Sequence, residues 1–73
     1  MEEFRINWMR IGNRVAEMRM ARGITQMELA AKIDVPQSTI ASWETGRAFP
    51  RAEKLPAIAN ALDCTIDELL KAE

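Results

Sequence analysis

A helix-start signal that occurs twice is the strongest constraint on the fold of this chain. Residues 25–28 (TQME) and 65–68 (TIDE) both fit the capping box, in which a threonine and a glutamate three positions later satisfy each other's backbone donors. The first box predicts a short helix over residues 26–33, which ends before Pro36. The second predicts a helix with Ile66, Leu69 and Leu70 as its apolar side.

Apolar residues at helical spacing predict three further helices. The first of these ends near Gly23, the next extends from Pro36 to Gly46, and the last carries Pro56 in its first turn. Their apolar stripes are, in chain order, Trp8, Ile11, Val15 and Met18; Ile40 and Trp43; and Leu55, Ile58, Ala59 and Leu62. Five short helices and no sheet follow from these patterns.

The composition agrees with one small folded domain. The chain has 73 residues, of which 48% are hydrophobic and 29% charged, whereas a disordered chain combines low hydrophobicity with high net charge. We expect a compact all-α domain over residues 1–73, with residues 1–7 as a short N-terminal extension. Phe4, Ile6 and Trp8 alternate as in a short strand, which leaves the structure of that extension open.

Cysteine and histidine usage argues against several kinds of site. Cys64 is the only cysteine and there is no histidine, so an intrachain disulfide is excluded and the commonest metal ligand is missing. We expect no enzyme activity, no metal and no cofactor. We also expect a cytoplasmic protein, because the sequence has neither a membrane-length apolar run nor a basic segment followed by an apolar signal core. Cys64, Trp43 and three methionines, Met18, Met20 and Met27, are interpreted as packing groups.

The charge of the chain is unevenly distributed. The net charge is −1, which for the whole chain argues against a nucleic-acid partner. However, residues 5–54 contain nine bases and five acids, a local charge of +4, whereas residues 55–73 carry −3 and the first residues −2. Ordinary solvated faces would also explain this distribution. If the chain binds DNA, its DNA-facing side is expected to be the basic one, carrying Arg47 and Arg51.

Two of the predicted helices form the pattern of a helix-turn-helix. The helices over residues 26–33 and 37–45 are separated by about three residues, and short polar side chains open the second helix. Gln37, Ser38, Thr39 and Ser42 face outward on it and can meet base edges in a major groove, while Ile40 and Trp43 face inward.

At this level of detail the chain resembles the Cro and lambda-repressor type of helix-turn-helix domain, often called the XRE family. The resemblance extends from about Ile11 to Leu70. It rests on residues 19–23, 24–30 (ITQMELA), 36–40 (PQSTI), 43–47 (WETGR), Pro50, and Leu55 with 58–62 (IANAL). It implies a lambda-repressor-like fold with its motif over residues 25–46, and a sequence-specific transcriptional regulator, a repressor, that reads the major groove of double-stranded DNA with helix 37–45.

The resemblance also implies roles for individual residues. Base-reading positions match Gln37, Ser38 and Ser42, and Gln37 is suited to pair with adenine through two hydrogen bonds. Positions beside the DNA backbone match Thr25, Gln26, Thr45 and Arg47, with Arg51 a weaker candidate. In such domains the glutamine matching Gln26 can also brace the one matching Gln37. Arg19 and Glu44 match a structural ion pair between helices.

Several alternatives stay open. Thr25 is explained equally well as a capping residue alone, and Ser38 and Ser42 as solvent-exposed side chains. Pro36 stands where relatives often have a capping serine or threonine, and Ser42 is shorter than the residue that many relatives have there. A homodimer on DNA is expected, with its contacts made by Ile66 and Leu70, by the N-terminal extension, or by DNA itself. The other reading is a protein-interaction module or antitoxin-type subunit with weak DNA binding.

Overall fold

Both capping boxes form in the computed structural model, which describes residues 8–70. Thr25 and Glu28 exchange backbone-to-side-chain hydrogen bonds of 2.7 and 3.0 Å, and Thr65 and Glu68 exchange bonds of 2.8 and 3.0 Å. The first box begins α2 (Gln26–Ile33), and the second begins α5 (Ile66–Leu70). The extension over residues 1–7 lies outside the described residues.

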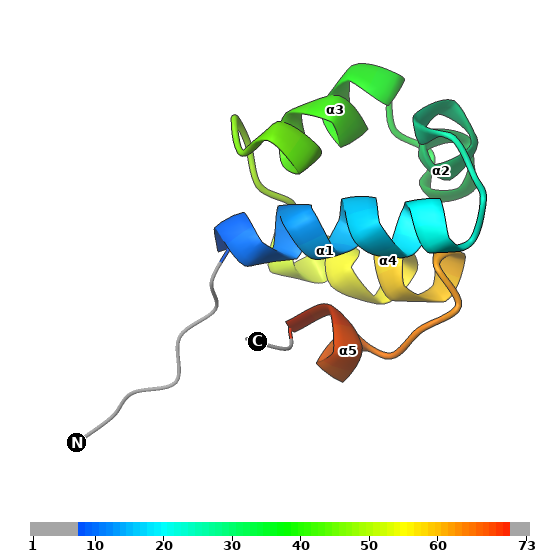
Figure 1. Cartoon of the computed structure of the whole chain (residues 1–73). Coiled ribbons are helices and arrows are strands. Elements are labelled where there is room, and N and C mark those ends of the chain that lie inside the picture. The colour runs from blue at the N-terminus through cyan, green and yellow to red at the C-terminus, as the bar shows by residue number, and fades with distance from the viewer. Residues whose placement is uncertain (1–7, 71–73) are drawn as a thin grey trace.

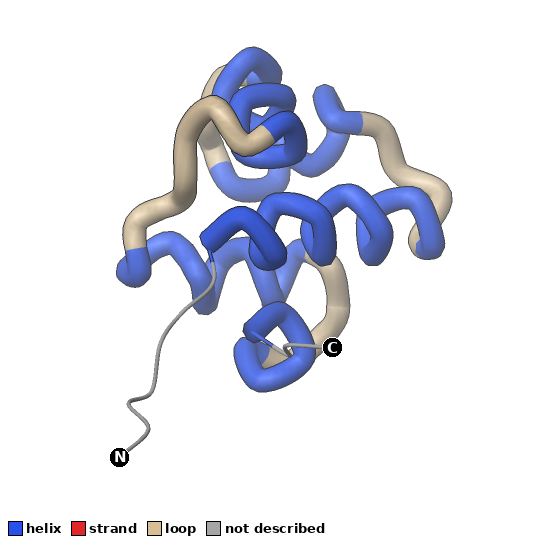
Figure 2. The backbone as a smooth tube through the Cα atoms, turned by 60° about the vertical axis from the view of Figure 1, so that its left-hand side comes forward, coloured by secondary structure: helices blue, strands red, loops and turns tan. Residues whose placement is uncertain are grey.

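Three further α-helices complete the fold and confirm its all-α class. They are α1 (Trp8–Ala21), α3 (Gln37–Thr45) and α4 (Leu55–Ala61), and a single 3₁₀ turn, η1 (Ala52–Lys54), leads into α4. Between residues 8 and 70 the chain contains no strand. Figure 1 shows α1 between α3 on one side and α5 on the other, and Figure 2 shows the same helices joined by short loops. The motif helices α2 and α3 lie together on the side of α1 opposite α5.

One residue at each end determines where α3 begins and where it stops. Pro36 occupies the N-cap with φ −65° and makes no side-chain capping hydrogen bond, as predicted. Gly46 ends the helix in the left-handed region with φ 82°, which only glycine adopts without a steric cost. In the turn before α3, Asp34 holds a φ of 59°, and its backbone N–H reaches the carbonyls of α2.

The predicted apolar stripes form one core, except that Ile66, expected on the apolar side of the last helix, is exposed. Ile40 and Trp43 point inward from α3, so the opposite face of this helix is turned to solvent. The buried residues are Ile11, Val15, Leu29, Ala30, Ile33, Ile40, Trp43, Leu55, Ile58, Ala59, Leu62 and Leu69. Trp8, Met18, Cys64 and Leu70 pack against them in partly buried positions.

Two of the methionines interpreted as packing groups are on the surface instead. The exposed fraction is 61% for Met20 and 70% for Met27, so that interpretation was wrong for both. Met20 is two residues after Met18, and Met27 two residues before Leu29, which places each about 200° around its helix from a core position. Met18 and Trp43 do pack as expected.

Arg14 of α1 and Arg22, one residue past the end of α1, hold the C-terminal part of the fold through its backbone carbonyls. Arg14 donates from Nε and Nη2 to the carbonyl oxygen of Glu68 at 3.2 and 2.9 Å, and Arg22 donates to the carbonyl oxygen of Asp63 at 3.0 Å. Leu69 is fully buried beneath this attachment. Together these contacts fix a helix of five residues, too short to be stable alone, against α1.

Candidate nucleic-acid interface

The outward face of α3 contains a shallow hollow lined mainly by polar side chains. Its volume is about 300 Å³. The lining residues are Gln37, Ser38, Ala41, Ser42, Thr45 and Arg47. All three residues expected to read bases therefore lie together on one surface, and the buried pair Ile40 and Trp43 fixes that surface from behind.

Gln37 does not project freely from this surface. Its Nε2 donates a hydrogen bond of 2.6 Å to Oε1 of Gln26, at the first position of α2. This bond leaves the Gln37 carbonyl oxygen and one amide hydrogen unused. The side chain thus presents one acceptor and one donor. These complement adenine, which has a donor at N6 and an acceptor at N7.

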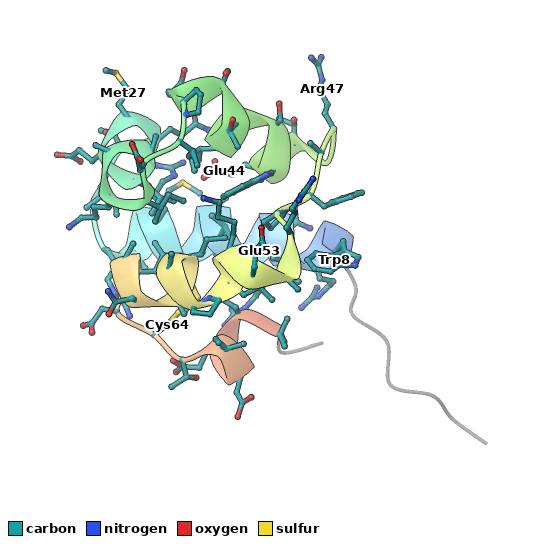
Figure 3. All side chains as sticks on the ribbon, turned by 180° about the vertical axis from the view of Figure 1, so that it is seen from behind. Trp8, Met27, Glu44, Arg47, Glu53 and Cys64 are labelled. Atoms are coloured by element: carbon teal, nitrogen blue, oxygen red, sulfur yellow. The ribbon has the colours of Figure 1, made fainter. Side chains whose placement is uncertain are left out.

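An ion pair between α1 and α3 lies directly behind the two glutamines. Arg19 and Glu44 form two hydrogen bonds, Nε to Oε2 at 2.7 Å and Nη2 to Oε1 at 3.1 Å, and their side chains are only 13% and 7% exposed. Arg19 also donates to the carbonyl oxygen of Ile24 at 2.8 Å. The hydrogen bonds to Glu44 raise the pKa of Arg19 above its ordinary value, despite partial burial. Figure 3 shows Glu44 inside the molecule, toward α1, and away from the exposed edge of α3.

Gln26 connects this ion pair to the outward surface. Its Nε2 donates to Oε1 of Glu44 at 2.8 Å, while its own Oε1 accepts from Gln37. Gln26 is half-buried, and its side chain lies between the two partners. The ion pair and the hollow are therefore parts of one hydrogen-bonded system.

The hydroxyl of Thr25 can take two roles at once. Its oxygen accepts from the backbone N–H of Glu28 as the N-cap of α2. A capping oxygen that accepts still has its hydroxyl hydrogen to donate. The capping and phosphate interpretations of Thr25 are therefore compatible rather than alternative.

The remaining three candidates differ in what their side chains are free to do. Thr45 donates its hydroxyl to the carbonyl oxygen of Ala41 at 2.9 Å, so a contact with phosphate would require that hydroxyl to leave the helix. Arg47 and Arg51 are exposed, and Figure 3 shows Arg47 projecting outward from the loop that follows α3. Met27 projects outward from α2 on the same side of the molecule.

The basic segment seen in the sequence does not translate into a uniformly basic face. Arg19 is neutralised by Glu44, and Arg14 and Arg22 bind carbonyls on the α5 side of α1. Three of the nine bases are therefore used for folding. Of the bases expected on the face of α3, Arg47 borders the hollow, whereas Arg51 lies in the loop before η1.

Ala41 is a residue of this surface that sequence reasoning missed. It follows Gln37 by four positions, which places both on the same face of a helix. Its small side chain lines the hollow between longer polar groups. Helical spacing alone indicates this position, but the prediction of surface residues considered only polar side chains and so omitted an alanine.

The described part of the chain offers no cluster for a metal ion, and its one thiol is shifted away from the ionised form. Residues 8–70 contain no group of three or more Cys, Asp or Glu side chains arranged to hold a metal ion. Burial raises the pKa of Cys64, with the charge of Glu68 acting in the same direction, so the thiol is less ionised at neutral pH. Within the same range, every helix is either too short or too polar to cross a membrane.

The fold and this surface define a helix-turn-helix protein, and comparison with known families agrees. The helix-turn-helix family model matches residues 15–69, which is most of the chain. The chain belongs to this family, with relatives of the Cro and lambda-repressor type.

Individual relatives are regulators of transcription. The chain is 34% identical over 65 residues to the transcriptional activator BcrR of Enterococcus faecalis, covering 89% of this chain and 32% of BcrR. It is 38% identical over 61 residues to the phage CTXphi repressor RstR of Vibrio cholerae, covering 84% of this chain and 54% of RstR. It therefore spans between about a third and a half of the curated relatives it matches.

A solved structure extends the likeness to three dimensions. The P22 c2 repressor, crystallised in complex with a synthetic operator, superimposes with a TM-score of 0.77 at 33% sequence identity. The match covers 86% of this chain and 96% of the repressor chain. The likeness therefore extends over most of the chain.

Proposed function

We propose that this chain is a sequence-specific DNA-binding regulator of transcription, acting as a repressor, that inserts α3 into the major groove. The observation that carries the proposal is the outward face of α3, where Gln37 is held with one donor and one acceptor free. A helix that buries Ile40 and Trp43 and exposes short polar groups fits the major groove, which admits an α-helix and presents hydrogen-bond donors and acceptors on its base edges. The proposed role also implies a cytoplasmic location.

The proposed contacts fall into two classes. Gln37 pairs with adenine, and Ser38 and Ser42 meet neighbouring base edges from the same hollow. Thr25, Gln26, Thr45, Arg47 and Arg51 contact phosphates. Backbone contacts of this second class fix the register of the protein on the duplex and carry no sequence information.

A homodimer on DNA is part of the proposal. One motif reads few base pairs, and two-fold dimers on half-sites about 34 to 36 Å apart are the usual solution. On α5, Ile66 is partly exposed while Leu70 is half-buried against the core, so Ile66 is the better candidate for a contact between protomers. Sedimentation that finds only one protomer on a two-half-site duplex would contradict the dimer.

The deciding experiment is selection of bound sequences from a random duplex pool. The wild-type chain is expected to enrich one motif, and Gln37→Ala is expected to lose the preference at one base pair while keeping the rest. Enrichment of no motif would contradict the proposed function. An unchanged motif with Gln37→Ala would contradict the base-reading role of Gln37.

Salt dependence tests the phosphate contacts separately. Each neutralised phosphate contributes about −0.9 to the slope of log affinity against log salt concentration. Arg47→Ala is therefore expected to reduce the slope by about 0.9 per protomer. Arg22→Gln is the matched control, because Arg22 binds a backbone carbonyl on the α5 side and is expected to leave the slope unchanged.

The net charge of −1 favours a second candidate, a protein-interaction module with the same fold. The same titration decides between the two. Absence of any duplex binding at 50 mM salt, a condition in which phosphate contacts are strong, would favour the interaction module.

A further inference from the structure

Four side chains form a hydrogen-bonded series from the largely buried ion pair to the outward face of α3. Arg19 donates to Glu44, Gln26 donates to Glu44, and Gln37 donates to Gln26. The three links measure 2.7, 2.8 and 2.6 Å. Every link has its donor and acceptor in a defined order, and the series ends at the group proposed to read a base.

The order of the series is determined at its buried end. A carboxylate can only accept and a guanidinium can only donate, whereas an amide offers a donor on one side and an acceptor on the other. If the Gln26 amide were turned over, its carbonyl oxygen would face the Glu44 carboxylate, so that two acceptors would meet without a hydrogen. Glu44 therefore holds the Gln26 nitrogen inward and its oxygen outward.

The orientation of Gln37 follows from that of Gln26. The outward oxygen of Gln26 accepts only a donor, so the Gln37 nitrogen turns toward it. One Gln37 amide hydrogen is then occupied, and one hydrogen and the carbonyl oxygen remain. A released amide could instead present both hydrogens to N7 and O6 of guanine, which are both acceptors.

We propose that Glu44, held in place by Arg19, is a positioning residue for base specificity: it sets the donor–acceptor order that Gln37 presents to DNA and so favours adenine over guanine. This inference rests on the proposed function. The buried ion pair then contributes to sequence reading as well as to stability, although neither Arg19 nor Glu44 touches a base.

The first test uses the free protein and the side-chain amide signals of Gln37 in nuclear magnetic resonance. In the wild type, one of the two Gln37 amide hydrogens is expected to be protected from solvent exchange. Glu44→Gln is expected to remove that protection, because its side chain can present either a donor or an acceptor to Gln26. Glu28→Gln is the matched control, since Glu28 lies on the same helix as Gln26 but binds only Thr25 in the capping box.

The second test measures discrimination between adenine and guanine at the base pair whose preference disappears with Gln37→Ala. Glu44→Gln is expected to reduce the ratio of the two affinities about fivefold or more, the lower range for one bidentate base contact. In the Gln37→Ala background the same substitution is expected to change nothing further. Gln26→Met interrupts the series but keeps both Arg19 and Glu44. This variant tests the same proposal if Glu44→Gln fails to fold.

The outcomes separate this inference from the proposed function. A wild-type chain that selects no duplex overturns the proposed function and with it the role in base reading. A wild-type chain that selects one, together with folded Glu44→Gln and Gln26→Met variants that keep the adenine preference, overturns the positioning role alone. Unchanged protection of the Gln37 amide in Glu44→Gln would also overturn it.

Discussion

Gly12 of α1 lies against the backbone carbonyl of Trp43 of α3, and no side chain fits between them. A Cβ atom at residue 12 would collide with that carbonyl oxygen and crowd its carbon atom. Because the obstacle is backbone, Gly12→Ala can be accommodated only if α1 and α3 separate. The expected cost is about 1–3 kcal/mol. A thermal melt should show it as a decrease of about 4–8 °C in Tm for each kcal/mol.

Gly23 provides the control for this substitution. It has a φ of 72°, but apart from its two chain neighbours no residue has an atom within 4 Å of the place that an alanine methyl group would take. Gly23→Ala therefore costs only backbone strain, about 1 kcal/mol. If Gly12→Ala were no more destabilising than Gly23→Ala, close contact between α1 and α3 would not be the reason for Gly12.

The Arg19–Glu44 pair should be a major contributor to stability when one partner is removed. Glu44→Ala leaves the guanidinium of Arg19 largely buried without its carboxylate, and such a loss costs about 3 kcal/mol or more. Glu17→Ala is the matched control, because Glu17 pairs with Arg14 at 3.3 Å on the surface with 64% of its side chain exposed. Its expected effect is below about 1 kcal/mol. Equal melting curves for wild type and Glu44→Ala would refute a structural role for the pair.

Replacing Asp34 by glycine is expected to stabilise the protein. Asp34 has a φ of 59° in the turn between α2 and α3, where any residue with a Cβ atom is strained. Glycine removes this strain but also gains freedom in the unfolded chain, so the expected net gain is about 0.5 kcal/mol. Chemical denaturation should show a higher midpoint for Asp34→Gly. Asp67→Gly, within the first turn of α5, should instead lower the midpoint, because that residue has helical geometry.

Acid should weaken the attachment of α5 through Glu68. Hydrogen bonding with the backbone of Thr65 lowers the pKa of Glu68, and the hydroxyl of that residue and the charges of Arg22 and Arg14 act in the same direction. A carboxyl group with a folded-state pKa below its unfolded value stabilises the fold above the unfolded value, about 4.3, and loses this contribution as the pH falls through the folded value. Glu68→Gln keeps a capping side chain without a titrating group. The variant should therefore lose less stability than the wild type between pH 6 and acid conditions, and a parallel loss would contradict the capping interaction.

The motif helices could be predicted from the sequence because their boundaries depend on neighbouring residues. The capping box at Thr25, the fixed torsion of Pro36 and the left-handed Gly46 determine the ends of α2 and α3, which match the predicted ranges. The apolar stripes also predicted the core, since burial follows directly from helical spacing.

The connections between side chains of different helices were harder to predict. The resemblance implied a brace between Gln26 and Gln37, but the link from Gln26 to Glu44 depends on the relative placement of three helices. Charge counting along the chain likewise could not show that Arg14 and Arg22 turn toward α5. Such contacts arise from the packing of the helices, which local sequence patterns do not specify.

The attachment of α5 through backbone atoms leaves its exposed side chains free to vary. Arg14 and Arg22 bind carbonyl oxygens, which every residue possesses whatever its side chain. Apart from Leu69, Leu70 and the capping pair Thr65 and Glu68, this end of the chain can therefore accept many substitutions without losing its attachment to α1. A library randomised at residues 66 and 67 should yield mostly folded variants, so new surfaces could be introduced at this end of the protein without disturbing the motif helices α2 and α3.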